Sequence, residues 1–297
     1  MDSNLTTTPS IASAAMLVEL SIGTWTGRKL DKRASQDVTT QANAAKGVAN
    51  VSKKLLGDCA ELDAVQKFTA NARNVHYACT MPWSDTGLRL LPTKQYFKYH
   101  QEMTALQTEF ERLVREFLDA YDWEIQNAQL KLGGLFNADE YPTRDSLTAK
   151  FRFRMNYMPL PEAGDFRVDI EAEAKQALAS QYESYYAKQF ESAMADVWQR
   201  TYDAISKMSE RLDYAGKEDR KVFRDSLVDN MHEVIDLLGV CNVTGDPTMA
   251  DAQRRLDQAL RGVTPDALRE DAYLRAQTKR EVDAVKQIID NLPGLGF

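Results

Sequence analysis

The sequence lacks the features that mark secreted, disulfide-bonded and membrane-spanning proteins. Its three cysteines are an odd number with no C-x-x-C pair, so neither a disulfide framework nor a zinc knuckle is indicated. Residues 1–10 show no basic segment leading into an apolar one, the pattern of a secretory signal. The longest apolar stretches, such as residues 11–20, contain polar breaks and are too short to span a bilayer. These absences predict a soluble, cytoplasmic protein with reduced thiols and no membrane partner.

Motifs of the common catalytic sites are also missing. The sequence contains no P-loop, no dinucleotide-binding glycine pattern, no H-E-x-x-H and no G-x-S-x-G. The histidines His76, His100 and His232 have no neighbouring ligand at metal-binding spacing. Paired carboxylates such as Asp139 and Glu140 arise by chance in an acidic helical chain. We therefore expect no enzymatic activity, no cofactor and no metal.

Charge is present but unevenly distributed. The chain has 297 residues, 43% of them hydrophobic, which suffices for a sizeable core, and a net charge of −7. Residues 1–100 contain 12 Lys/Arg against 8 Asp/Glu, whereas residues 101–297 contain 25 against 36. We predict a basic N-terminal helical region over residues 1–92 and a second region over 93–297, with one continuous domain as the alternative. An anionic partner is expected to meet the first region or a local basic patch elsewhere.

Helical periodicity dominates the chain. Two long stretches, residues 93–132 and 171–212, carry apolar side chains every three or four positions. Because a stripe of that length needs an equally long cover, we predict that they form an antiparallel helical hairpin. Shorter helices are expected to pack against it; they cover residues 11–22, 36–55, 61–79, 221–238 and 249–260, a last helix begins at Thr264 and Pro265, and a loop covers residues 82–92. The predicted fold is mainly α.

Strand patterns are confined to residues 149–170. Residues 151–157 alternate rings or methionine with polar side chains, residues 159–164 have turn composition, and residues 166–170 alternate again. Alternation places Arg152 and Arg154 on the side opposite the rings, and Arg167 on the polar side of the return strand. We predict a β-hairpin at the tip of the helical hairpin, with three arginines facing solvent.

Cations interleave with rings in three stretches, at residues 24–33, 93–100 and 150–157. Single-stranded nucleic acid is held by this combination, because bases stack on rings while Lys and Arg neutralise phosphates. The candidate phosphate contacts are Arg28, Lys29, Lys32, Arg33, Lys94, Lys98, Arg152, Arg154 and Arg167. The candidate stacking residues are Trp25, Tyr96 and Tyr99. The alternative for each stretch is structural: the rings face the core and the charges are an ordinary solvated surface.

The segment FRFRMNYMPLPEAGDFRVDI (151–170) is followed by ADVWQRTYDAISKMSERL (195–212) and by a helix that leads into N-V-T-G-D-P (242–247). With these marks the second half of the chain, about residues 150–297, resembles a helical family of phages and bacteria catalogued only as a domain of unknown function. Members often lie beside AAA+ ATPase and von Willebrand-type genes. The resemblance implies an assembly partner and transfers no catalytic residue.

Over its whole length the chain also resembles, without any defining short motif, the single-stranded-DNA-binding RNA polymerase cofactors of lytic podophages that package a virion RNA polymerase. That resemblance implies single-stranded DNA and a phage polymerase as partners, in transcription or replication. The competing hypothesis is a helical adaptor that docks onto a protein such as an AAA+ ATPase, without nucleic acid. Self-association is compatible with an elongated helical hairpin, and the sequence fixes no stoichiometry.

Overall fold

The structure, a computed structural model, describes residues 11–160, 172–214, 221 and 224–293. The chain divides into two compact units, each assembled from segments that are distant in the sequence. The helical unit comprises Met1–Val18, Cys79–Phe97 and Tyr157–Phe297; the ribbon unit comprises Glu19–Ala78 and Lys98–Asn156. The described residues are mainly α-helical, as predicted. Residue 92 lies inside the Cys79–Phe97 segment of the helical unit, and the division of the chain predicted there stays a prediction.

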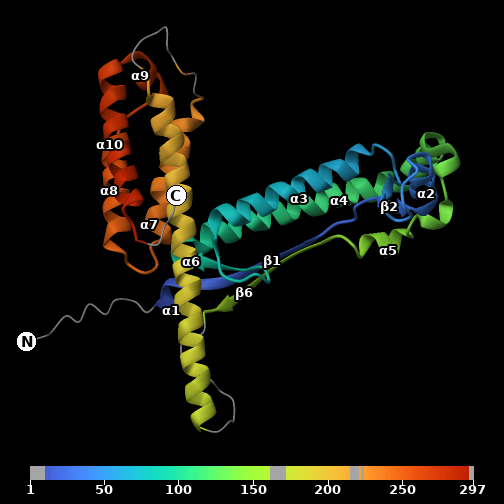
Figure 1. Cartoon of the computed structure of the whole chain (residues 1–297), viewed down its shortest axis with the longest axis horizontal. Coiled ribbons are helices and arrows are strands. Elements are labelled where there is room, and N and C mark those ends of the chain that lie inside the picture. The colour runs from blue at the N-terminus through green and yellow to red at the C-terminus, as the bar shows by residue number, and fades with distance from the viewer. Residues whose placement is uncertain (1–10, 161–171, 215–220, 222–223, 294–297) are drawn as a thin grey trace, which may run out of the picture. The chain divides into compact units, whose positions relative to one another are not determined.

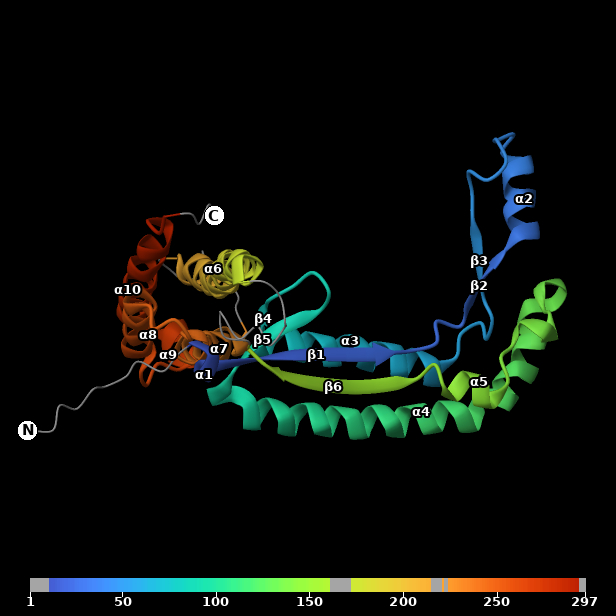
Figure 2. The same ribbon diagram turned by 90° about the horizontal axis from the view of Figure 1, so that it is seen from below.

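Two helices that run side by side in Figures 1 and 2 form the body of the ribbon unit, α3 (Ala60–Cys79) and α4 (Tyr96–Leu132). They are antiparallel: the end of α3 meets the start of α4 through His76 Nδ1 and the Tyr99 hydroxyl, 2.7 Å apart. At the other end, Lys131 Nζ donates to the backbone oxygen of Asp58 at 3.1 Å. The helix α3 matches the range predicted for it.

Strand β6 (Arg152–Pro159) supplies part of the cover for α4. The rings of Phe110 and Phe153 lie 5.7 Å apart between centroids, and those of Phe117 and Phe151 lie 5.6 Å apart. Trp25 also packs against α4, with its ring 6.2 Å from that of Phe117. The apolar stripe of α4 is therefore buried within the ribbon unit.

The remaining elements of the ribbon unit are short. Figure 2 shows β2 and β3 side by side next to α2. The strands and helices are β2 (Arg28–Asp31), α2 (Lys32–Gln41), β3 (Val51–Lys54), the 3-10 turns η2 (Gly133–Leu135) and η3 (Ala138–Glu140), and α5 (Arg144–Thr148). They contain seven of the 17 Lys/Arg of the ribbon unit.

The helical unit is a bundle in which α6 contacts α7 and α10, and α8 contacts α7 and α10 (Figure 1). Its helices are α1 (Ile11–Ala14), α6 (Ala172–Leu212), α7 (Ser226–Cys241), α8 (Pro247–Leu260), α9 (Pro265–Glu270) and α10 (Ala272–Asp290), with the 3-10 turn η1 (Thr93–Gln95). The predicted cap is present, because Thr264 accepts a hydrogen bond from the backbone N–H of Ala267 and Pro265 occupies the first turn. Buried Val197, Ile205 and Leu238 belong to one continuous apolar core.

Strands β4 (Met81–Pro82), β5 (Leu88–Pro92), β1 (Ala15–Gly23) and β6 form a four-stranded sheet in that order. The predicted loop at residues 82–92 is thus a β-hairpin. Its turn closes with the Gly87 N–H donating to Ser84 O at 3.3 Å, and Gly87 has φ +100°, which glycine adopts at no steric cost.

The helix predicted over residues 11–22 is wrong. Only Ile11–Ala14 is helical, and β1 follows directly. An apolar run this short fits a buried strand as well as a helix, and pairing within the sheet decides between them. The helix predicted over residues 36–55 is also wrong, because α2 ends at Gln41 and Asn43 (φ +50°) and Gly47 (φ +89°) lead the chain into β3.

The two long helices have the predicted extents, but the hairpin between them is not confirmed. The stripe of α4 packs within the ribbon unit, whereas α6 packs on α7 and α10. Periodicity identifies a stripe but carries no information about its partner. Of the predicted β-hairpin, the first strand is present as β6, and its neighbour in the described sheet is β1. The predicted return strand, with Arg167, lies outside the described residues.

Candidate nucleic-acid interface

The antiparallel ribbon of β2 and β3 places cations directly opposite one another. Arg28 pairs with Lys54, and Lys29 pairs with Lys53. Opposed side chains in an antiparallel pair share one face and lie close together, so like charges there repel. The sequence between Trp25 and Leu55 contains seven Lys/Arg and only two Asp, the densest positive charge in the chain.

One face of the ribbon is directed to solvent. Arg28, Leu30, Ser52 and Lys54 lie on this face and are all exposed. The ribbon is anchored at its base, where the Leu55 N–H donates to Gly27 O at 2.7 Å. Anchoring at the base holds the exposed face in a defined conformation.

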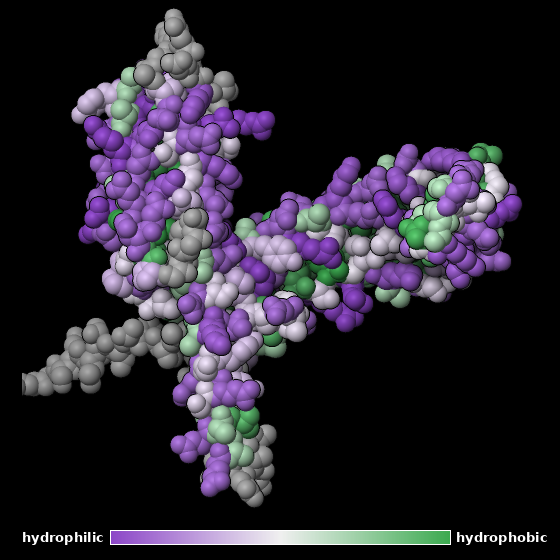
Figure 3. All heavy atoms as spheres, viewed as in Figure 1, coloured by the Kyte–Doolittle hydropathy of each residue, from purple (hydrophilic) through white to green (hydrophobic). Residues whose placement is uncertain are grey.

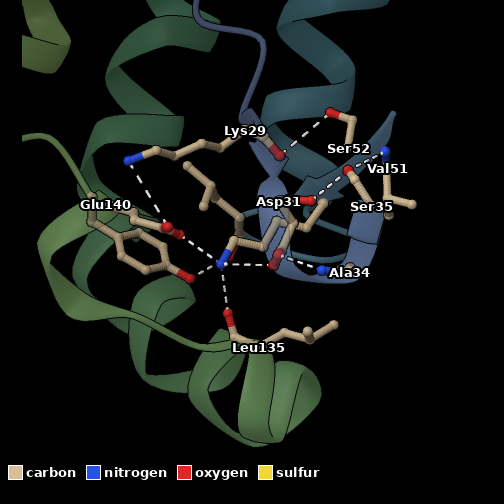
Figure 4. Close-up of polar contacts among 11 residues, drawn as sticks. Lys29, Asp31, Ala34, Ser35, Val51, Ser52, Leu135 and Glu140 are labelled. Carbon is tan, nitrogen blue, oxygen red and sulfur yellow. Dashed lines mark hydrogen bonds and ion pairs between the residues drawn. The ribbon is translucent and has the colours of Figure 1, made fainter. Parts of the chain in front are cut away.

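On the opposite face, Lys53 joins the ribbon to the segment that follows α4. Its ammonium lies 2.7 Å from Glu140 Oε2 and 3.5 Å from Asp31 Oδ2, and it donates to Leu135 O at 2.7 Å. Figure 4 labels these three partners. Its side chain is only 8% exposed. The hydrogen-bonded carboxylate of Glu140 raises the pKa of Lys53. Lys53 is therefore a structural cation.

Asp31 joins the ribbon to α2. Its side chain accepts a hydrogen bond from the Ala34 N–H at 3.0 Å and caps the helix. This hydrogen bond lowers the pKa of Asp31, with a further contribution from Lys53. Ser35 donates to Asp31 O at 2.6 Å and accepts from the Val51 N–H at 2.9 Å, so α2 is tied to both strands (Figure 4).

Four exposed cations around the ribbon lack a carboxylate partner in the described part of the chain: Arg28, Lys32, Arg33 and Lys46. Lys29 is only 3.9 Å from Glu140, and the exposed Lys54 pairs with the exposed Asp58. Lys32 and Lys46 line a hollow of about 290 Å³ between α2 and the segment that leads into β3, together with Leu30 and Asn50. We name the six residues Arg28, Lys29, Lys32, Arg33, Lys46 and Lys54 the ribbon cations.

A second basic row lies on β6. Arg152 and Arg154 are exposed, whereas Phe153 between them is 7% exposed, so the predicted alternation of arginines and rings is present. Neither arginine has a carboxylate within ion-pair distance among the described residues. Gly23 of β1 lies so close to this row that a Cβ atom at that position would be only 2.9 Å from Arg152 Cγ. β1 therefore supports the base of this row.

The predicted stacking rings are less available. Trp25 is 8% exposed and Tyr99 is fully buried, so neither presents a face to a base. Trp25 lies edge-on to Tyr121, with 5.9 Å between ring centroids, and fills the core. Tyr96 is half-buried against Tyr157, at 5.3 Å between centroids. The structural alternative for these rings, core packing, fits what is observed.

Both lysines of the stretch at residues 93–100 reach solvent. Lys94 is exposed in the helical unit and Lys98 is exposed in the ribbon unit. The ribbon unit also brings Lys46, Lys53 and Lys54 into the neighbourhood of Arg28–Arg33, and none of these three is among the candidates predicted from the sequence. Their signal was present, since a lysine pair at the end of a β-branched segment is typical of an edge strand.

Among the described residues, no helix combines the length and the apolar character needed to cross a membrane. Comparisons with protein-family models, with curated proteins and with solved structures found no match. The resemblances drawn from the sequence therefore remain expectations.

Proposed function

We propose that the protein binds single-stranded DNA without catalysis and holds its phosphates on the ribbon cations. The observation that supports this most directly is the exposed cross-strand pair of Arg28 and Lys54. Two like charges held opposite one another destabilise a ribbon. A polyanion relieves that repulsion and releases its own counterions on binding.

Contacts to phosphate contribute to affinity but do not distinguish one DNA sequence from another. Arg152 and Arg154 on β6 extend the proposed contact, since both are exposed cations of the same unit. Because Trp25 and Tyr99 are buried, binding rests mainly on charge. The preference for a single strand, and the recruitment of a phage RNA polymerase by the bound protein, are supported only by the sequence resemblance and form part of the same proposal.

A second candidate function is docking onto a protein partner. The helical unit contains 20 Lys/Arg against 28 Asp/Glu, whereas the ribbon unit contains 17 against 16. The face of α6 to α10 in Figure 3 is covered mainly by hydrophilic side chains. The excess of Asp/Glu over Lys/Arg in this unit favours a basic partner, such as a positively charged face of an ATPase.

Fluorescence anisotropy of labelled single-stranded and duplex oligonucleotides, titrated at several salt concentrations, tests the first proposal. The variant Arg28→Ala/Lys54→Ala removes two ribbon cations. We expect the slope of log affinity against log salt to flatten by roughly 0.7 per lost contact on a single strand. The matched control, Arg254→Ala/Arg261→Ala, removes two exposed arginines of the helical unit and should leave affinity unchanged.

Equal losses in both variants would mean that only overall charge matters and would refute a site on the ribbon. Absence of binding to either oligonucleotide at tens of micromolar protein would favour docking onto a protein. Tighter binding to duplex than to single strand would keep the ribbon site but refute the single-strand preference.

A further inference from the structure

Cys59, Glu61 and Glu124 bring a thiol and two carboxyl groups together at one end of the α3–α4 pair. One candidate ligand atom from each residue lies within 4.8 Å of the other two. Cys59 precedes α3, Glu61 lies in its first turn, and Glu124 projects from α4. The Cys59 sulfur is 3.6 Å from Glu61 Oε2. The cluster joins residues of two helices, Glu61 and Glu124, that are more than sixty positions apart in the sequence.

Glu124 provides an independent reason to look for a ligand here. It is 4% exposed, and its Oε2 has no hydrogen-bond partner among the described residues. A buried acceptor without a partner is costly, and more so when it is charged. Burial raises the pKa of Glu124, although Lys131 opposes that shift. The Lys131 ammonium donates to the backbone oxygen of Asp58 and forms no ion pair with Glu124.

We propose that Cys59, Glu61 and Glu124 bind a divalent cation of the zinc class. Zinc accepts a thiolate together with carboxylate oxygens in a tetrahedral site, whereas magnesium and calcium take oxygen ligands alone. Three protein ligands leave the fourth position for water. Glu61 is only partly buried, which gives a hydrated ion a route into the site.

Binding exchanges one proton for the metal. Cys59 is a buried free cysteine, and an apolar environment favours its neutral thiol form in the metal-free protein. When the metal binds, the S–H bond breaks, a sulfur–metal bond forms, and the proton passes to solvent. The ion would cross-link the start of α3 to α4. Its ligand Cys59 follows Lys54, the last residue of the ribbon, by five residues. This inference does not depend on DNA binding.

Cobalt(II) is the probe, because a thiolate ligand gives it a charge-transfer absorption in the near ultraviolet. Titration of the full chain should produce this band with one equivalent of cobalt, and zinc should remove it. Cys59→Ser should abolish the band. Cys241→Ser, which alters another buried cysteine in the helical unit, should retain it. Absence of the band from the wild type, or its persistence in Cys59→Ser, would overturn the proposal.

Glu124→Gln keeps the test decisive if Cys59→Ser does not fold. The amide has nearly the same shape but is a poor ligand, so we expect zinc affinity to fall by about a hundredfold. Without metal, this variant should unfold at a temperature equal to or above that of the wild type, since a buried carboxyl has been removed. Zinc should raise the Tm of the wild type much more than that of the variant. Equal rises in both proteins would contradict the assignment.

Discussion

The two units of the molecule treat their cations differently. In the helical unit, six cations pair with an aspartate three or four residues away: Arg200, Arg254, Arg255, Arg261, Arg269 and Lys279. In the ribbon unit, Arg28 and Lys29 instead face Lys54 and Lys53 across a two-stranded ribbon. These cations of the helical unit have carboxylate partners on the same helix, whereas Arg28, Lys32, Arg33 and Lys46 around the ribbon have none among the described residues.

Lys53 differs from the other cations of residues 25–55 because its charge is paired and buried inside the ribbon unit. It is one of the seven cations of the ribbon segment, yet it is buried against Glu140 and Asp31 and serves the fold. Its neighbour Lys54 points to the exposed face. Adjacent lysines in one strand therefore separate into a structural role and a proposed binding role, because side chains alternate between the two faces.

The largest effect is expected from reversing charge on the exposed face of the ribbon. Arg28→Glu/Lys54→Glu should weaken binding to single-stranded DNA by about a hundredfold near physiological salt, since two phosphate contacts are lost and repulsion is added. Arg254→Glu/Arg261→Glu changes the net charge equally and should weaken binding only a few-fold. Anisotropy titrations measure both, and similar losses would break the comparison between the units.

Removing the structural lysine comes next. Lys53→Met should lower the free energy of unfolding by about 1–2 kcal/mol, because two partly buried carboxylates lose their partner. Urea denaturation followed by circular dichroism measures this change. Lys54→Met removes an exposed charge from the same strand and should shift the midpoint far less. An equal shift in both variants would contradict the separation of roles.

The stabilisation from this cluster should also depend on pH. The pKa of Lys53 is raised on folding, so its contribution is complete below the pKa of an unfolded lysine and is lost as pH rises through the higher folded value. The pKa of Asp31 is lowered, so its contribution is present above the unfolded value, near 3.8, and is lost as pH falls through the lower folded value. The difference in unfolding midpoint between wild type and Lys53→Met should therefore be constant near neutral pH and shrink at both extremes.

A moderate effect is expected on β6. Arg152→Ala/Arg154→Ala should flatten the salt slope by up to about 1.4 on a single strand and leave the fold intact, since both side chains are exposed. An unchanged slope and affinity would remove β6 from the interface and confine the site to the ribbon.

The smallest effect is expected where cations are freed without being clustered. Asp251→Asn removes the partner of Arg254 and Arg255 on α8. Exposed ion pairs contribute little, so the unfolding midpoint should hardly move. DNA affinity should also stay constant. A gain in affinity would show that unpaired arginines anywhere on the surface suffice.

The sequence predicts the elements with strong periodicity and misses those decided by pairing. The long helices α4 and α6 and the cap at Thr264 follow from local patterns. Strand β1 does not, because its apolar run is compatible with a helix or a strand, and only its pairing with β5 and β6 in the sheet decides between them. The partner of each long helix also depends on the whole fold, which explains why a hairpin of α4 and α6 was expected.

The candidate site divides along the same line. The cation-rich segment from Arg28 to Arg33 and the alternation on β6 are visible in the sequence. The contribution of Lys46 and Lys54 depends on the β2–β3 register, which joins residues 20 to 26 positions apart. The burial of Trp25 and Tyr99 likewise depends on α4 and α3, so a ring beside cations cannot be assigned to stacking from composition alone.

Lysine footprinting tests the central claim most directly, since it compares both units in one sample. The full chain is acetylated with and without a single-stranded oligonucleotide, and each lysine is quantified by mass spectrometry. We expect the oligonucleotide to protect Lys32, Lys46 and Lys54 while the exposed Lys188 and Lys207 of the helical unit keep their reactivity. Protection of Lys188 and Lys207 with no protection of the ribbon lysines would contradict the assignment of the DNA site.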